Sequence, residues 1–136
     1  MPPQLNNWSV SYATISRLEA ILRRHDRVVS FSRERDILFH ITRQKPMPGI
    51  RAILVNRYTF SIADYFSLVD EFAEFDSIIL GGNWNGYTED AKEQALKDRR
   101  GLFVCGEFVG SLNIPAHFEY VQKDDKGKPV HFKKTG

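Results

Sequence analysis

The sequence contains a single cysteine, Cys105, among its 136 residues. One cysteine cannot form an internal disulfide, and without a second one the chain has neither a zinc ribbon nor a redox pair. Long apolar stretches are also missing, since no run approaches the roughly 18 residues that a membrane-spanning helix needs. A signal peptide has a charged region followed by an apolar one, and the first seven residues show neither. We therefore expect a cytoplasmic protein in a reducing compartment, with no membrane partner.

The composition is typical of one globular domain. Hydrophobic residues make up 42%, aromatic residues 12% and charged residues 26% of the chain, which excludes the disordered and fibrous classes. A chain of this length can bury a core without disulfides or a structural metal. We predict a single domain over residues 1–136, with a core at about 11–113 and a C-terminal β-hairpin extension at about 114–136.

The net charge of +2 conceals an uneven distribution along the chain. Residues 1–57 carry ten Lys or Arg against four Asp or Glu, residues 58–122 carry four against eleven, and residues 123–136 carry five against two. Nine of the first ten cations are arginines, which suit bidentate contacts with phosphate. DNA or RNA is therefore a candidate partner, through Arg23, Arg24, Arg33, Arg35, Lys126, Lys128, Lys133 and Lys134. The alternative is a solvated surface that pairs with the acidic helices or binds another protein.

The N-terminal part of the chain predicts a helix followed by a β-hairpin. Residues 11–24 carry apolar side chains at helical spacing, namely Ile15, Leu18, Ile21 and Leu22. Ser16 and Glu19 match a capping box at or just inside the start of this helix. Residues 27–31 and 36–42 predict two strands joined by a polar turn at 32–35. Two prolines make residues 45–49 a loop, and the apolar run 50–55 predicts a third strand, covered on both faces.

The second half predicts two longer helices, two buried strands and a terminal hairpin. Ser61 is the expected cap of a helix whose apolar stripe consists of Ile62, Tyr65, Phe66, Val69 and Phe72. Thr88 is the expected cap of the next helix, which packs through Ala91, Ala95 and Leu96. Strands are predicted at 76–80 and 101–105, a short helix at 107–112. The hairpin is predicted to pair 117–122 with 130–134.

This order of elements predicts an α/β domain with three layers. A helix between two buried strands implies a right-handed crossover and a parallel pair, whereas the preceding hairpin makes the sheet mixed. We expect strand 50–55 to be central, between strand 36–42 and strand 76–80. The helix at 62–72 should pack across it with Phe66 buried.

Three stretches resemble the Mrr-like branch of the restriction-endonuclease-like, or PD-(D/E)XK, superfamily. ILVNRY at residues 53–58 resembles the strand that ends in V-Q-x-K-R-Y, and YTEDAKEQA at 87–95 resembles the helix start that follows the fourth strand. LFVCGEFVGSL at 102–112 resembles the next strand and its short helix. The resemblance covers roughly residues 14–113 and implies an αβββαβ core with a mixed sheet, with the C-terminal hairpin added.

The resemblance also implies where a catalytic site would lie. Such enzymes hold a divalent cation with an Asp at the start of the second strand and a Glu or Gln two residues before a Lys on the third. Asp36 stands at the first position as the expected metal ligand, and Glu19 stands where many members add an acidic residue. The third strand departs from the pattern, because the Lys position falls on Asn56 or Arg57 and the acidic position on Leu54 or Val55.

Two interpretations of this departure follow. The leading one is a restriction-endonuclease-like domain with a degenerate catalytic motif, acting as a nucleic-acid-associated or interaction module, for which the sequence implies no certain cofactor. The alternative is an active Mg²⁺-dependent nuclease that uses Asp36. Structural roles are also open, since Asp36 could be a turn residue, Glu19 a capping partner and Asn56 a residue that ends its strand.

A glycine-rich loop gives a third hypothesis. GGNWNG at residues 81–86 follows a predicted strand and leads into the helix capped by Thr88. Glycines at a strand end, followed by the free amides of a helix start, can hold a phosphate or nucleotide. Gly82, Asn83 and Thr88 are the candidate phosphate ligands, although Glu89 and Asp90 at the helix start would repel an anion.

Overall fold

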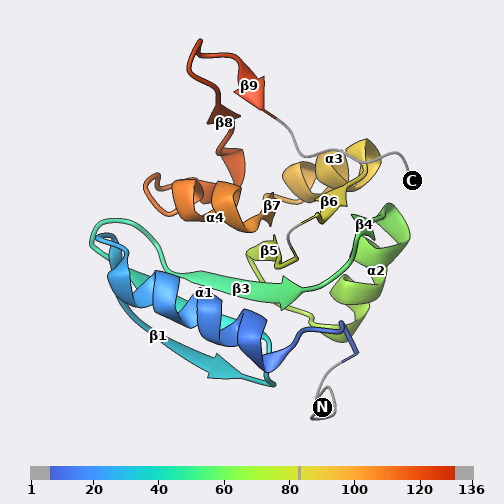
Figure 1. The fold of residues 1–136 in the computed structure, drawn as a ribbon, viewed down its shortest axis with the longest axis horizontal. Coiled ribbons are helices and arrows are strands. Elements are labelled where there is room, and N and C mark those ends of the chain that lie inside the picture. The colour runs from blue at the N-terminus through green and yellow to red at the C-terminus, as the bar shows by residue number, and fades with distance from the viewer. Residues whose placement is uncertain (1–6, 83, 131–136) are drawn as a thin grey trace.

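The computed structural model describes residues 7–82 and 84–130, which form an α/β fold around a mixed five-stranded sheet (Figure 1). The sheet has the order β1-β2-β3-β5-β7, made of β1 Val28–Glu34, β2 Leu38–Arg43, β3 Ile50–Val55, β5 Ser77–Leu80 and β7 Gly101–Val104. The first three strands are antiparallel neighbours, whereas β3, β5 and β7 run parallel. The predicted α/β class, the mixed sheet and the central place of the third strand are confirmed.

In the part of the chain that the structure describes, four α-helices accompany this sheet, namely α1 Tyr12–Arg24, α2 Ile62–Glu71, α3 Glu89–Lys97 and α4 Cys105–Ser111. Ser61 caps α2 in a capping box with Asp64, and Thr88 caps α3 by accepting from the backbone N–H of Ala91, as expected. The capping box expected at Ser16 is wrong. Ser11 is the N-cap of α1, since its hydroxyl accepts from the Thr14 N–H at 3.2 Å, and Ser16 lies inside the helix.

The helices bury their apolar faces against the strands and one another. α1 lies along the β1 to β3 part of the sheet (Figure 1) and buries Ile15, Leu18 and Leu22. α2 packs against α3, and both α3 and α4 pack against β7. Within the described residues no helix is long and apolar enough to span a membrane.

The buried face of α2 differs from the predicted one. Tyr65, Leu68 and Phe72 are buried, whereas the Phe66 side chain is 51% exposed, so the prediction that Phe66 is a core residue is wrong. The spacing of three and then four residues from Tyr65 places the buried stripe on one face and leaves Phe66 beside it. Leu96 of α3 is also exposed, because Ala91 and Ala95 alone form its buried face.

The turn of the first hairpin lies later in the chain than expected. β1 continues to Glu34, which pairs with Leu38, so the turn consists of residues 35–37. Arg35 and Asp36 have φ angles of 48° and 71°, a conformation that suits a tight turn and not a strand. Asp36 is therefore a turn residue and does not begin the second strand.

The C-terminal part is less extended than predicted. Strand β7 ends at Val104 because Cys105 begins α4, and His117–Glu119 forms the 3₁₀ helix η1 instead of a strand. The buried His117 donates from Nε2 to the carbonyl oxygen of Asp76 at 3.0 Å, which holds η1 against the start of β5. The hairpin exists as β8 Gln122–Lys123 and β9 Pro129–Val130, and its predicted continuation to residue 134 lies outside the described residues.

One small sheet was not predicted. β4 Thr59–Phe60 and β6 Gly86–Tyr87 form a parallel pair beside the main sheet. The Gly86 N–H donates to the Tyr58 carbonyl at 2.9 Å and the Thr88 N–H donates to the Phe60 carbonyl at 3.0 Å. This pair fixes both ends of the connection between β5 and α3.

Candidate functional site

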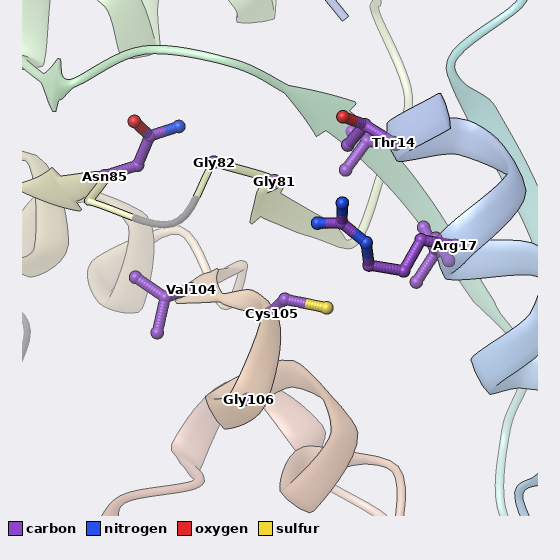
Figure 2. A pocket seen from close by; sticks show the side chains of 10 residues that line it. Thr14, Arg17, Gly81, Gly82, Asn85, Val104, Cys105 and Gly106 are labelled. Atoms are coloured by element: carbon purple, nitrogen blue, oxygen red, sulfur yellow. The ribbon is translucent and has the colours of Figure 1, made fainter. Parts of the chain in front are cut away.

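A crevice of about 290 Å³ opens where the parallel strands β3, β5 and β7 end (Figure 2). Parallel strands bring their carboxyl ends to one edge of a sheet, and ligands of α/β proteins bind there. The walls come from the first half of α1, the end of β3, the glycine loop after β5 and the start of α4. They consist of Thr14, Arg17, Leu18, Leu54, Gly81, Gly82, Asn85, Val104, Cys105 and Gly106.

Two glycines give the crevice its shape. A Cβ on Gly81 would lie 2.7 Å from Cγ2 of Thr14 and 3.0 Å from Cδ1 of Leu54, so only glycine lets α1 approach the end of β5 this closely. A Cβ on Gly82 would lie 2.5 Å from Nδ2 of Asn85. The glycine loop is therefore packed tightly against its neighbours.

Arg17 is the cation of the crevice. Its side chain extends from α1 into the space between Gly81 and Cys105 (Figure 2). Among residues 7–82 and 84–130, no carboxylate lines the crevice, and no hydrogen bond or ion pair holds the Arg17 guanidinium. An arginine in such surroundings keeps its donors available for an anion, which it binds in a planar, bidentate way.

Cys105 lies opposite Arg17 with its thiol half-buried (Figure 2). Burial raises the pKa of the Cys105 thiol above its ordinary value, although the charge of Arg17 opposes this shift. A raised pKa keeps the thiol protonated at neutral pH, and the thiolate is the nucleophilic form. The protonated thiol of Cys105 is therefore a weak nucleophile in this crevice.

Asn56 holds the rim of the crevice together. Its Oδ1 accepts from Nδ2 of Asn85 at 2.8 Å, and its own Nδ2 donates to the carbonyl oxygen of Ser9 at 3.2 Å. The residue after β3 thus connects the N-terminal segment with the glycine loop. Arg57 lies elsewhere, with its guanidinium 4.7 Å from the centre of the Trp8 ring and its Nε 3.7 Å from Oδ1 of Asp64.

The two carboxylates of the expected catalytic site meet at one arginine. Arg33 places Nε 3.4 Å from Oε2 of Glu19 and Nη1 3.1 Å from Oδ1 of Asp36. The same Nη1 donates to the Asp36 carbonyl oxygen at 3.0 Å. The structure therefore brings Asp36 and Glu19 to the same guanidinium, that of Arg33. In the described part of the chain, no group of three or more His, Cys, Asp or Glu could hold a metal ion.

The cations proposed to contact nucleic acid fall into two separate groups. Arg23 and Arg35 lie near the first hairpin, with their guanidinium carbons 5.5 Å and 4.2 Å from the ring centres of Phe31 and Phe72. Arg33 belongs to this region and Arg24 is exposed near the end of α1. Lys126 and Lys128 lie in the β8–β9 hairpin, at the opposite end of the molecule (Figure 1). Lys133 and Lys134 lie outside the described residues.

The three candidate phosphate ligands of the glycine loop are also separated. Gly82 lines the crevice, whereas Asn83 lies outside the described residues. The Thr88 hydroxyl donates to Oδ1 of Asp90 at 2.5 Å and accepts from the Ala91 N–H at 3.4 Å. These contacts make Thr88 the cap of α3, and it is not part of the crevice wall.

Comparisons with models of protein families, with curated proteins and with solved structures find no match for the chain. The crevice is therefore the feature of this chain that indicates a function. Sequence reasoning missed Arg17 and Cys105 as its lining residues. The glycine loop after a buried strand indicated this edge of the sheet, but nothing in the sequence indicated that α1 would cover it.

Proposed function

We propose that this chain is a restriction-endonuclease-like domain with a degenerate catalytic motif, which binds a phosphate group of a nucleic acid in the crevice without hydrolysing it. The observation that carries the proposal is the Arg17 guanidinium, which enters the crevice beside described wall residues that include no carboxylate. A phosphodiester is a singly charged anion with two terminal oxygens, which the guanidinium fork matches.

The position of the crevice supports the family assignment. A helix, a three-stranded antiparallel unit, a second helix and a parallel strand follow one another in the chain, which is the order that the resemblance implies. Leu54 stands at one of the two possible acidic positions of the third strand, and its side chain lines the crevice. A leucine thus stands in the crevice wall at a position where the resemblance implies an acid, whereas Asp36 and Glu19 do not line this crevice.

The same residues argue against hydrolysis. Leu54 cannot ligate a cation, and Asp36 and Glu19 share the single positive charge of Arg33. Two carboxylates that share a guanidinium offer a poor octahedral site for Mg²⁺. We expect no cleavage of plasmid, linear or single-stranded DNA with Mg²⁺ or Mn²⁺, and the same result for Asp36→Ala. Metal-dependent cleavage that Asp36→Ala abolishes would establish the nuclease alternative instead.

Binding is tested by fluorescence anisotropy with a labelled single-stranded oligonucleotide at about 50 mM salt, where phosphate contacts are strong. Arg17→Gln is expected to weaken binding by about tenfold or more, because a hydrogen-bonded charge contact is lost. Lys97→Gln, on an exposed turn at the end of α3, removes the same charge and should leave the affinity within about twofold.

Two further results complete this test. The affinity of the wild type should fall steeply as salt rises, as it does for phosphate contacts. Equal loss in Arg17→Gln and Lys97→Gln would mean that only net charge matters and would contradict a site at Arg17. No binding by the wild type at about 50 mM salt would contradict the nucleic-acid proposal and favour a protein partner. Circular dichroism of each variant establishes that it is folded.

A further inference from the structure

Trp84 is an exposed aromatic residue in the loop that forms one wall of the crevice. Its side chain is 78% exposed, although large aromatic residues are on average well buried. The tryptophan lies in a turn closed by the Asn85 N–H and the Gly82 carbonyl oxygen, 3.4 Å apart. Gly82 and Asn85, the two residues that close this turn, both line the crevice. The backbone of Trp84 is therefore directly bonded to a wall residue of the site, Asn85.

The base of this turn is fixed to the sheet. Asn85 is held by Asn56, whose side chain donates to Ser9 and whose backbone N–H donates to the Trp8 carbonyl oxygen at 3.0 Å. The next residue, Gly86, belongs to β6. Since adjacent Cα atoms are about 3.8 Å apart, Trp84 cannot move far from Asn85 and the crevice.

The crevice thus combines two kinds of contact. Arg17 supplies a cation inside it, and Trp84, the residue before the wall residue Asn85, supplies an exposed aromatic side chain. A nucleotide unit carries the matching groups, a phosphate and a planar base. A volume of about 290 Å³ is at the lower end for small-molecule sites and suits one such unit better than a duplex.

We propose that the site takes one unpaired nucleotide, with its phosphate on Arg17 and its base stacked on Trp84. This inference rests on the proposed function and defines its substrate class as single-stranded nucleic acid or a nucleotide. A base within a duplex is stacked on both faces and is not available to the ring, whereas an unpaired base is.

The decisive probe is a pair of short single-stranded oligonucleotides with the same number of phosphates, a hexamer of deoxythymidine and a hexamer of abasic residues. Stacking of a base on an aromatic side chain accounts for about 5- to 150-fold in affinity. We expect Trp84→Ala to weaken binding of the thymidine hexamer by a factor in this range. Trp84→Phe keeps a ring and should retain most of the affinity. Binding of the abasic hexamer should be unchanged in Trp84→Ala.

Tryptophan fluorescence gives an independent reading, because the chain has two tryptophans and Trp8 is buried. In Trp8→Phe the emission comes from Trp84 alone, and the thymidine hexamer should quench it while the abasic hexamer should not. Trp8 also donates from Nε1 to Oε1 of Glu71 at 2.9 Å, so its replacement removes a hydrogen bond. If Trp8→Phe does not fold, the difference in emission between the wild type and Trp84→Phe gives the Trp84 signal.

The outcomes separate this inference from the proposed function. If Arg17→Gln loses binding of both hexamers and Trp84→Ala leaves both affinities unchanged, base stacking is overturned and phosphate binding is kept. No effect of either substitution would overturn both. If thymidine monophosphate binds, and its binding requires both Arg17 and Trp84, the ligand is a free nucleotide. A clear preference for the thymidine hexamer over the monophosphate would assign a nucleic-acid strand as the ligand. Equal affinity for the hexamer and for a duplex of the same length would contradict the unpaired base.

Discussion

Tyr65→Ala is expected to lower the free energy of unfolding by about 3 to 5 kcal/mol, as other truncations of large buried aromatic side chains do. The Tyr65 ring is fully buried within the core. Its hydroxyl donates to Oδ2 of Asp98 at 2.6 Å and accepts from Nη1 of Arg100 at 3.0 Å. Burial, followed by the hydrogen bond to Asp98, raises the pKa of Tyr65 to about 12, so this hydroxyl remains a donor at neutral pH. Urea denaturation followed by circular dichroism measures the change.

The neighbouring residue provides the matched control. Phe66 is 51% exposed, so Phe66→Ala removes little buried area and should cost about 1 kcal/mol or less. Tyr65→Phe keeps the ring and loses only the hydroxyl, for which about 1 kcal/mol is expected. If Phe66→Ala proved as costly as Tyr65→Ala, the orientation of α2 described above would be wrong.

Arg43→Met should also destabilise the protein by about 3 to 5 kcal/mol, because it removes a buried charged hydrogen-bonding group. Arg43 is 2% exposed, and burial lowers the pKa of its guanidinium. Its donors lie 2.8 Å from the carbonyl oxygen of Pro48 and 3.2, 2.7 and 3.0 Å from those of Leu112, Ile114 and Pro115. Methionine fills a similar volume but leaves these carbonyl groups without their donor.

The region in which hydrogen exchange increases distinguishes the loss of the Arg43 hydrogen bonds from a general destabilisation of the fold. Arg43 on β2 holds the segment that follows α4, so hydrogen exchange should increase most in residues 112–120 of Arg43→Met. Arg24→Met, at the exposed end of α1, removes the same charge and should cost less than about 1 kcal/mol. Unchanged exchange in residues 112–120 would contradict the role assigned to Arg43.

Much of the fold follows from local patterns in the sequence. The apolar spacing of residues 11–24, the prolines after the second strand and the caps Ser61 and Thr88 are signals that act within a few residues. Strand 50–55 is apolar at nearly every position, which is sufficient to predict a central strand. Such patterns identify elements and their approximate ends.

The wrong predictions concern residues whose burial or secondary structure depends on a neighbour distant in sequence. Tyr65 and Phe66 are adjacent aromatic residues, and the buried hydroxyl of Tyr65 has its partners, Asp98 and Arg100, on another part of the chain. His117 leaves the predicted strand because the Asp76 carbonyl oxygen, 41 positions away, accepts its hydrogen bond. The strand propensity of a residue gives no information about such long-range contacts.

The candidate site shows the same division. By itself, the sequence determined the glycine loop, the missing acid on the third strand and a pair of acidic residues, Glu19 and Asp36, because these depend on residue type alone. Tertiary structure alone decided that Arg33 lies between those two carboxylates and that Arg17 enters the crevice. The physical reason is that α1 and the carboxyl ends of β3, β5 and β7 meet only when the sheet has formed, since long-range packing sets their positions.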